Sequence, residues 1–213
     1  MRAIETRHPI DAQNTAIDFY FDFISPYGWI GAEQIGSIAR RLKRALRWHP
    51  ILLKATVVEA MRLPPPLETP LKGPYLINDI KRSLRYNGLS LSGDARFGFS
   101  SISPARAVLW VRDMAPDKVE ALVLSLYRTH WSDGRDISNL NRVLDLIAAL
   151  GLPRKEAAAA LLGDAIKVAL HAETAAAIEA GIFGSPTFVI GNEIFWGADR
   201  LSMMEAWIEK GGW

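Results

Sequence analysis

Ser25 is the residue of this 213-residue sequence whose type and position most favour chemistry. It follows an apolar run rich in β-branched and aromatic residues, 17–24, and directly precedes Pro26. Because serine favours the N-cap of a helix and proline its first turn, a strand should end and a helix begin here. The N-terminus of a helix stabilises an anion such as a thiolate. Ser25 is thus either a simple helix cap or a hydroxyl placed beside a bound anion.

The complete absence of cysteine excludes several kinds of chemistry. The chain has no disulfide framework, no thiolate metal site and no cysteine nucleophile. Any thiol that reacts here must therefore arrive on a small molecule. The histidines do not indicate a metal site built by the chain, because they lie far apart and none follows the HExxH spacing; they are His8, His49, His130 and His171.

A second serine–proline pair, Ser185-Pro186, directly precedes a short apolar run, 187–190. A proline at such a place predicts a cis peptide bond, which would present the Ser185 backbone as a pairing edge for a peptide-like ligand. Further on, Asp199 opens another helix. There it would either cap that helix, which is the simpler role, or receive the amino group of a ligand.

Composition and charge indicate an ordinary globular protein. Hydrophobic residues are 49% of the chain and charged residues 23%. The 25 basic and 23 acidic residues leave a net charge of +2, too small to indicate a nucleic-acid partner. No run approaches the ~20 apolar residues of a membrane span, and residues 1–15 form a polar arm without the apolar core of a secretory signal. We expect a cytoplasmic protein that binds neither nucleic acid nor membrane.

The expected elements fall into three blocks. The first is a β-α-β unit with a parallel strand pair, whose strands are 17–24 and 46–53 and whose helix is 27–45. The middle block predicts only helices, at 75–86, 104–114, 118–131, 139–150, 154–161 and 164–180. The last block is expected to contain a hairpin, with strands 187–190 and 193–196, and then a helix, 201–209.

This order predicts an α/β fold in which a helical domain interrupts a sheet domain. The discontinuous sheet domain would consist of residues 16–62 and 181–213, and the inserted helical domain of residues 63–180. Residues 1–15 would form a flexible arm.

Four stretches of the sequence resemble the 2-hydroxychromene-2-carboxylate isomerases and the kappa-class glutathione transferases. They are residues 19–27 (FYFDFISPY), 130–138 (HWSDGRDIS), 181–188 (GIFGSPTF) and 195–201 (FWGADRL). The resemblance covers nearly the whole chain after Thr15. It implies a thioredoxin-like fold with an inserted all-helical domain, akin to the DsbA group.

The resemblance also implies roles for the matching residues around glutathione as cofactor. Ser25 would hydrogen-bond the glutathione sulfur, the Ser185 backbone before Pro186 would pair with the cysteinyl part, and Asp199 would hold the γ-glutamyl end with Ala198. The remaining residues expected near glutathione are Pro26, Tyr27, Lys72, Trp196 and Gly197.

On the substrate side the sequence departs from the isomerases. Val57 aligns with their pocket lysine, and residues 60–66 contain no asparagine where the family has a Gly-Asn pair. Lys54, a possible substitute for the lysine, and Arg62 are the substrate-binding candidates. These differences bear on the substrate more than on glutathione.

Three functions remain open at this point. The first is a glutathione-dependent isomerase of aromatic catabolism, which would act on a small aromatic unsaturated carboxylate by reversible thiolate addition. The second is a kappa-like transferase that joins glutathione permanently to an electrophile. The third is a peptide-binding module without catalysis. Thiol–disulfide exchange by the chain itself is excluded, because it has no cysteine. The resemblance also implies a possible homodimer.

Overall fold

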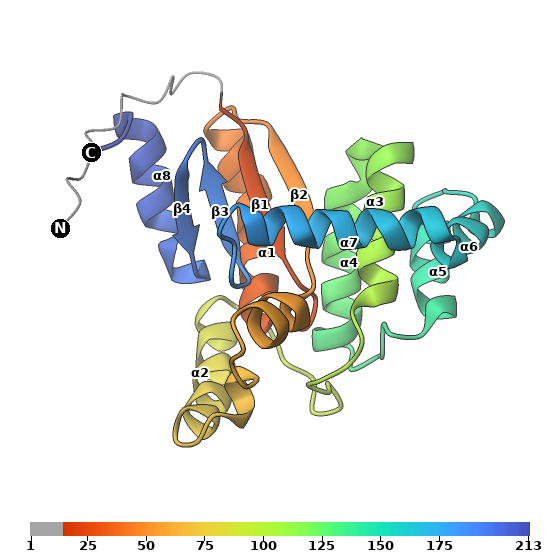
Figure 1. The fold of residues 1–213 in the computed structure, drawn as a ribbon, viewed down its shortest axis with the longest axis horizontal. Helices are drawn as coiled ribbons and strands as arrows, with labels where there is room; N and C mark the ends of the chain where they lie inside the picture. Colours follow the sequence, from red (N-terminus) through yellow and green to blue (C-terminus); the bar gives the residue numbers. More distant parts are fainter. Residues whose placement is uncertain (1–14) are drawn as a thin grey trace.

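The structure, a computed structural model, describes residues 15–213, so the expected N-terminal arm lies almost entirely outside the described residues. Its centre is a four-stranded sheet in the order β2-β1-β3-β4 (Figure 1). β1 (Ile17–Phe21) pairs in parallel with β2 (Leu46–Pro50) and antiparallel with β3 (Thr187–Ile190), which pairs antiparallel with β4 (Glu193–Trp196). Strands from distant parts of the chain therefore form one sheet, as the sequence predicts.

Alternation along β1 gives the sheet two different faces. Ile17, Phe19 and Phe21 are fully buried on one face, whereas Asp18 and Tyr20 point to the other. The buried face is apolar and the opposite face carries charge.

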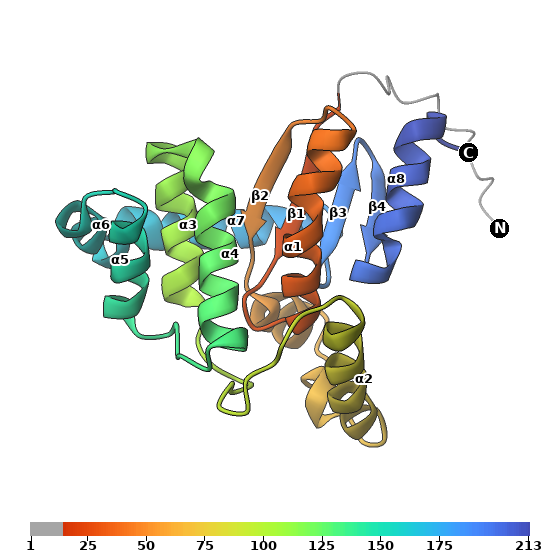
Figure 2. The same ribbon diagram turned by 180° about the vertical axis from the view of Figure 1, so that it is seen from behind.

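Helices cover both faces. α1 (Pro26–Arg41) and α8 (Leu201–Lys210) pack on the apolar face, and α7 (Asp164–Glu179) crosses the opposite face (Figures 1 and 2). α7 extends beyond β2 to reach the neighbouring helices, so it ties the sheet to the helical block.

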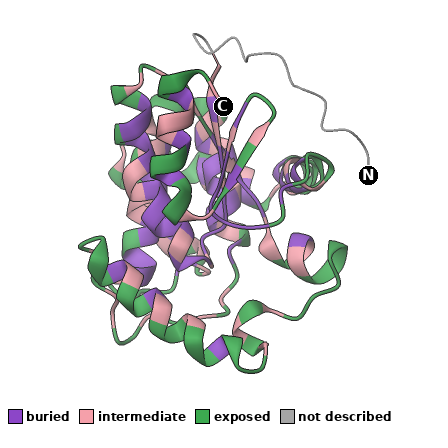
Figure 3. Ribbon diagram, turned by 90° about the vertical axis from the view of Figure 1, so that its left-hand side faces the viewer, coloured by how far each residue is buried: buried purple, intermediate pink, exposed green. Residues whose placement is uncertain are grey.

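The chain between β2 and β3 is helical, as predicted. Its helices besides α7 are α2 (Lys72–Tyr86), α3 (Ile102–Met114), α4 (Val119–Tyr127), α5 (Leu140–Ala149) and α6 (Arg154–Leu162). Buried residues line the strands and the inner faces of the helices, whereas the outer faces are exposed (Figure 3). No helix within residues 15–213 is long and apolar enough to cross a membrane.

Two segments differ from expectation. The second strand ends at Pro50 on the edge of the sheet, and Lys54–Ala60 forms an unexpected π-helical segment. The expected helix 118–131 divides, because α4 ends at Tyr127 and Arg128–Ser132 continues as a π-helical turn. This wider turn buries three consecutive side chains, 129–131.

Candidate functional site

The junction between β1 and α1 places Ser25 at the N-cap of α1. Its Oγ accepts the N–H of Gly28 at 3.0 Å, and Pro26 occupies the first turn, where an N–H is not needed. The first turn contains no acidic side chain, while Arg40 and Arg41 lie in the last. The positive end of the helix dipole is therefore not neutralised by its own first turn, and it suits an anion.

Ser25 and Ser185, here called the serine pair, join α1 to the loop before β3. The Ser25 hydroxyl donates to the Ser185 carbonyl oxygen at 2.9 Å, and the Asp22 N–H donates to the Ser185 Oγ at 3.0 Å. The peptide bond between Ser185 and Pro186 is cis. Ser25 is 7% exposed and Ser185 9%, so the pair lies just beneath the surface. The single hydrogen of the Ser25 hydroxyl is already in use.

The segment after β4 lies against the same loop. The Gly197 N–H donates to the Pro186 carbonyl oxygen at 2.9 Å, so Ala198 and Asp199 directly follow a residue that contacts this loop. Asp199 is exposed and makes no capping hydrogen bond, so the helix-capping role favoured from sequence is not seen. Its carboxylate lies 3.7 Å from the nearer nitrogen of Arg200.

Trp196 covers the loop before β3 from the outside. Its side chain is 53% exposed, and its ring packs on Phe183 with the ring centroids 5.0 Å apart. A Cβ at Gly184 would lie 2.2 Å from the indole nitrogen, so glycine is what leaves room for the indole. Trp196 thus presents an aromatic surface beside the cis peptide bond.

Asp22 contacts the serine pair through its backbone N–H, and its carboxylate binds the surrounding chain. Its carboxylate accepts the N–H groups of Ile24 at 3.2 Å and Leu53 at 2.7 Å, and the Ser101 side chain also hydrogen-bonds to it. The side chain is buried, and burial raises its pKa, although these donors partly offset the increase. Asp22 therefore connects β1, the segment after β2 and the start of α3.

Tyr127 of α4 completes this arrangement, here called the polar hub: Asp22, Ser25, Ser185 and Tyr127. Its hydroxyl donates to the Asp22 carbonyl oxygen at 3.0 Å. A Cβ at Gly28 would lie 2.6 Å from this hydroxyl and 2.7 Å from the Ser185 Oγ, so only glycine fits there. Sequence reasoning missed Asp22, Gly28 and Tyr127, because nothing in their local pattern shows that they meet.

The cationic candidates lie between the end of β2 and the start of α2. Lys54, Arg62 and Lys72 are exposed, and Arg62 has a positive φ of 56°. Tyr27 links α1 to α2, because its hydroxyl donates to an Asp79 carboxylate oxygen at 2.6 Å. Among residues 15–213, none of these three cations hydrogen-bonds to the polar hub.

Comparison with known proteins assigns the fold. A model described as a DSBA-like thioredoxin domain matches residues 16–209. The chain belongs to this DSBA-like family. It is 28% identical to 2-hydroxychromene-2-carboxylate isomerase of Sphingobium xenophagum over 193 residues, which are 90% of this chain and 97% of that protein. It is also 25% identical to glutathione S-transferase kappa 1 of Rattus norvegicus over 201 residues, 88% of each chain.

The structural comparison agrees with this assignment. A solved structure of 2-hydroxychromene-2-carboxylate isomerase superposes on this DSBA-like chain with a TM-score of 0.82 at 26% identity, covering 92% of this chain and 95% of the other. The expected thioredoxin-like fold with inserted helices, and the expected similarity to both enzyme groups, are confirmed.

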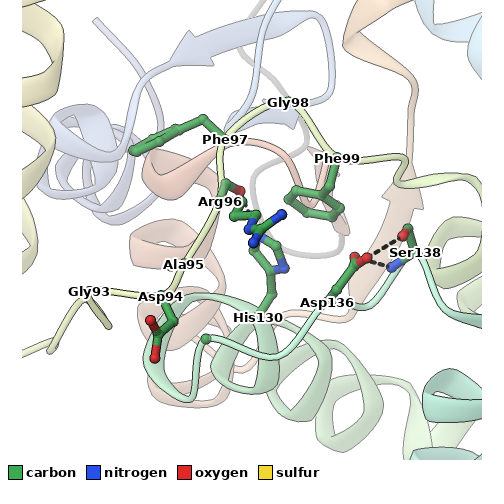
Figure 4. Close-up of a pocket in the computed structure, with 11 residues that line it drawn as sticks. Gly93, Asp94, Ala95, Arg96, Phe97, Gly98, Phe99, His130, Asp136 and Ser138 are labelled. Atoms are coloured by element: carbon green, nitrogen blue, oxygen red, sulfur yellow. Dashed lines mark hydrogen bonds between the residues drawn. The ribbon is translucent and has the colours of Figure 1, made fainter.

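The DSBA-like chain also has a cavity of about 750 Å³ that sequence reasoning did not find (Figure 4). The loop 93–99 and the segment after α4 line it, and none of the predicted site residues does. His130 is buried there, with its Nε2 2.9 Å from the Arg96 carbonyl oxygen and its ring 3.7 Å from the Phe99 ring centroid. Burial lowers the pKa of His130, which favours its neutral form, although hydrogen bonds to backbone carbonyls act in the opposite direction.

Proposed function

We propose that this DSBA-like protein is a glutathione-dependent isomerase. Its substrate would be 2-hydroxychromene-2-carboxylate or a similar aromatic unsaturated carboxylate. One observation carries the proposal: the Ser25 hydroxyl stands at the N-terminus of α1, in a chain that has no thiol of its own. The similarity to proteins with that isomerase name over about nine-tenths of the chain supports it.

The residues around the serine pair fit glutathione. The positive end of α1 suits a thiolate. The Ser185 N–H has no hydrogen-bond partner among residues 15–213, so it is available to a peptide-like ligand. The exposed Asp199 carboxylate suits the γ-glutamyl ammonium group, with Ala198 beside it. In this proposal residues 16–62 and 181–213 form the domain that holds glutathione.

When bound, glutathione would supply a thiolate that adds reversibly to an electron-poor double bond and so permits rotation about it. The role of the chain is to favour that thiolate. A free thiol has a pKa near ~8.5, and each unit by which helix N-terminus and hydroxyl lower it corresponds to ~1.4 kcal/mol. Because Ser25 forms no disulfide, the site would activate the thiol without exchanging electrons with it.

The exposed cations would serve the substrate side. We propose Lys54 and Arg62 as partners of the substrate carboxylate and Lys72 as a residue near glutathione, with residues 63–180 forming the inserted domain. Pro26 and Tyr27 shape the first turn beside the sulfur, and Trp196 and Gly197 flank the peptide.

Ser25→Ala tests the proposal. A hydrogen bond to a charged group contributes ~1.5–3 kcal/mol, so we expect glutathione-dependent turnover of 2-hydroxychromene-2-carboxylate to fall about ten- to hundredfold. Ser37→Ala, which removes an exposed hydroxyl from the same helix, is the matched control and should not change the rate. Turnover of Ser25→Ala within a factor of two of wild type would refute the mechanism.

A kappa-like transferase is the second candidate, because the chain is about as similar to kappa-class transferases as to the isomerases. Val57 and the missing asparagine also separate it from the isomerases on the substrate side. Mass spectrometry of the product distinguishes the two reactions. An isomer keeps the substrate mass, whereas conjugation adds one glutathione.

A further inference from the structure

We propose that the Ser185 carbonyl selects which thiols this site activates. Such a thiol carries an amide N–H on the carbon next to the one that bears its sulfur. This N–H donates to the Ser185 carbonyl in place of the Ser25 hydroxyl, which can then donate to the sulfur. The inference rests on the proposed function, since it concerns the same site, and it adds the class of thiol that the site accepts: cysteinyl peptides acylated on nitrogen.

The first step is the engagement of the Ser25 hydroxyl. A serine hydroxyl has one hydrogen to donate, and that of Ser25 goes to the Ser185 carbonyl oxygen at 2.9 Å. One of its acceptor positions is taken by the Gly28 N–H at 3.0 Å. Ser25 therefore cannot donate to a sulfur while it remains bonded to Ser185.

The second step is that the carbonyl needs a replacement donor. Ser185 is 9% exposed, and a buried carbonyl left without a partner is costly. Its residue is fixed in place, because the Ser185 Oγ accepts the Asp22 N–H at 3.0 Å and the Pro186 carbonyl accepts the Gly197 N–H at 2.9 Å. The hydroxyl, by contrast, moves by rotation about a single side-chain bond. The exchange therefore takes place at Ser25 and leaves the loop unchanged.

The third step follows from the chemistry of the ligand. In an N-acylated cysteine the amide N–H and the sulfur are separated by only two carbons, so one residue can replace Ser25 at the carbonyl and receive its hydrogen bond. A thiol without that N–H offers the carbonyl nothing in return. The serine pair thus couples peptide recognition to thiol activation.

Binding of S-methylglutathione, measured by titration calorimetry, tests the exchange without turnover. In wild type the ligand N–H competes with the Ser25 hydroxyl for the Ser185 carbonyl, and the thioether gives the hydroxyl no thiolate in return. In Ser25→Ala the ligand has no such competitor. A typical hydrogen bond implies that Ser25→Ala binds S-methylglutathione about three- to tenfold more tightly. With glutathione above the thiol pKa the order should reverse, because only wild type donates to the thiolate. Ser37→Ala should match wild type with both ligands.

The outcomes separate this inference from the proposed function. Equal or weaker binding of S-methylglutathione by Ser25→Ala would overturn the exchange, while glutathione binding with a lowered thiol pKa would still support the function. Failure of wild type to bind glutathione at all would overturn the function itself.

A second measurement uses wild type alone, in case Ser25→Ala does not fold. Because the chain has no cysteine, thiolate absorbance in the ultraviolet comes from the ligand only. The thiol pKa of bound glutathione should be lower than in solution, and that of an analogue methylated at the cysteinyl nitrogen should not. An equal lowering for both ligands contradicts the selection by the Ser185 carbonyl.

Discussion

Asp18 in β1 and Asp22 just after it are four positions apart, yet the fold holds the two carboxylates in opposite ways. Asp18 faces α7 and pairs with Arg47 at 2.5 Å and His49 at 2.7 Å. Burial would raise its pKa, but hydrogen bonds from His49 and Arg47 lower it. Asp22 is bound by N–H groups and a hydroxyl and, within residues 15–213, by no cation, and burial raises its pKa.

The groups around Asp18 therefore act through their charges, whereas the groups around Asp22 act by holding neighbouring residues in position. Around Asp18, ion pairs extend through His49 to Glu173 and Arg112, and they join β2 to α7 and α3. We call this set the charged cluster. Around Asp22, hydrogen bonds from uncharged donors to Ser185 and to the Asp22 carbonyl oxygen fix the position of the serine pair. The free energy of unfolding should therefore depend on pH through the groups around Asp18, and on side-chain size and hydrogen bonding through the groups around Asp22.

Removal of the Asp22 carboxylate should have the largest effect. Asp22→Ala leaves the N–H groups of Ile24 and Leu53 and the Ser101 hydroxyl without their acceptor in a buried place. We expect the free energy of unfolding to fall by about 3–4 kcal/mol, as measured by denaturant titration. Asp18→Ala is the matched variant, and we expect it to lose about 1 kcal/mol because its partners remain partly solvated. Equal losses for the two variants would contradict the distinction between the regions.

The elements of the fold were predictable because their signals are local. Alternation and β-branching predict β1, the Ser25-Pro26 pair predicts the start of α1, and Gly191-Asn192 predicts the hairpin. The π-helical segment Lys54–Ala60 has no such signal, since its apolar residues follow no clear period.

The site was predictable only in part, for a related reason. Ser25 and Ser185 are marked by the prolines that follow them, and the structure brings the two residues together. Tyr127 reaches Asp22 across 105 positions, and Glu173 reaches His49 across 124. No periodicity or spacing carries such information, because these contacts exist only after the helices have packed.

The shape of the polar hub leads to the next prediction. Gly28→Ala would place a Cβ 2.6 Å from the Tyr127 hydroxyl and 2.7 Å from the Ser185 Oγ, both of which are buried and hydrogen-bonded. We expect a loss of about 2 kcal/mol in the free energy of unfolding, from overpacking. Gly36→Ala on the same helix meets only the flexible end of Glu120, so it should be neutral or stabilising by up to ~1 kcal/mol. If Gly28→Ala were as stable as Gly36→Ala, the hub would be less rigid than we infer.

The charged cluster should give the smallest effect and the clearest dependence on pH. Burial would lower the pKa of His49, but hydrogen bonds to Asp18 and Glu173 raise it above its ordinary value of 6.5. Its stabilisation is therefore complete below pH 6.5 and is lost as the pH rises through the raised pKa. Burial would raise the pKa of Glu173, but His49 and Arg112 lower it from 4.5 to about 2. Its stabilisation is present above pH 4.5 and is lost as the pH falls toward about 2.

Denaturant unfolding of His49→Gln from pH 5 to pH 9 tests this sign. At pH 6 we expect the variant to be less stable than wild type by about 1 kcal/mol, since Asp18 and Glu173 keep their arginine partners. Wild type should lose stability above pH 6.5 and approach the variant, which lacks this slope. His171→Gln, exposed on α7, should follow wild type throughout. A constant difference between His49→Gln and wild type would mean that His49 contributes packing and not charge, and the cluster would then resemble the polar hub.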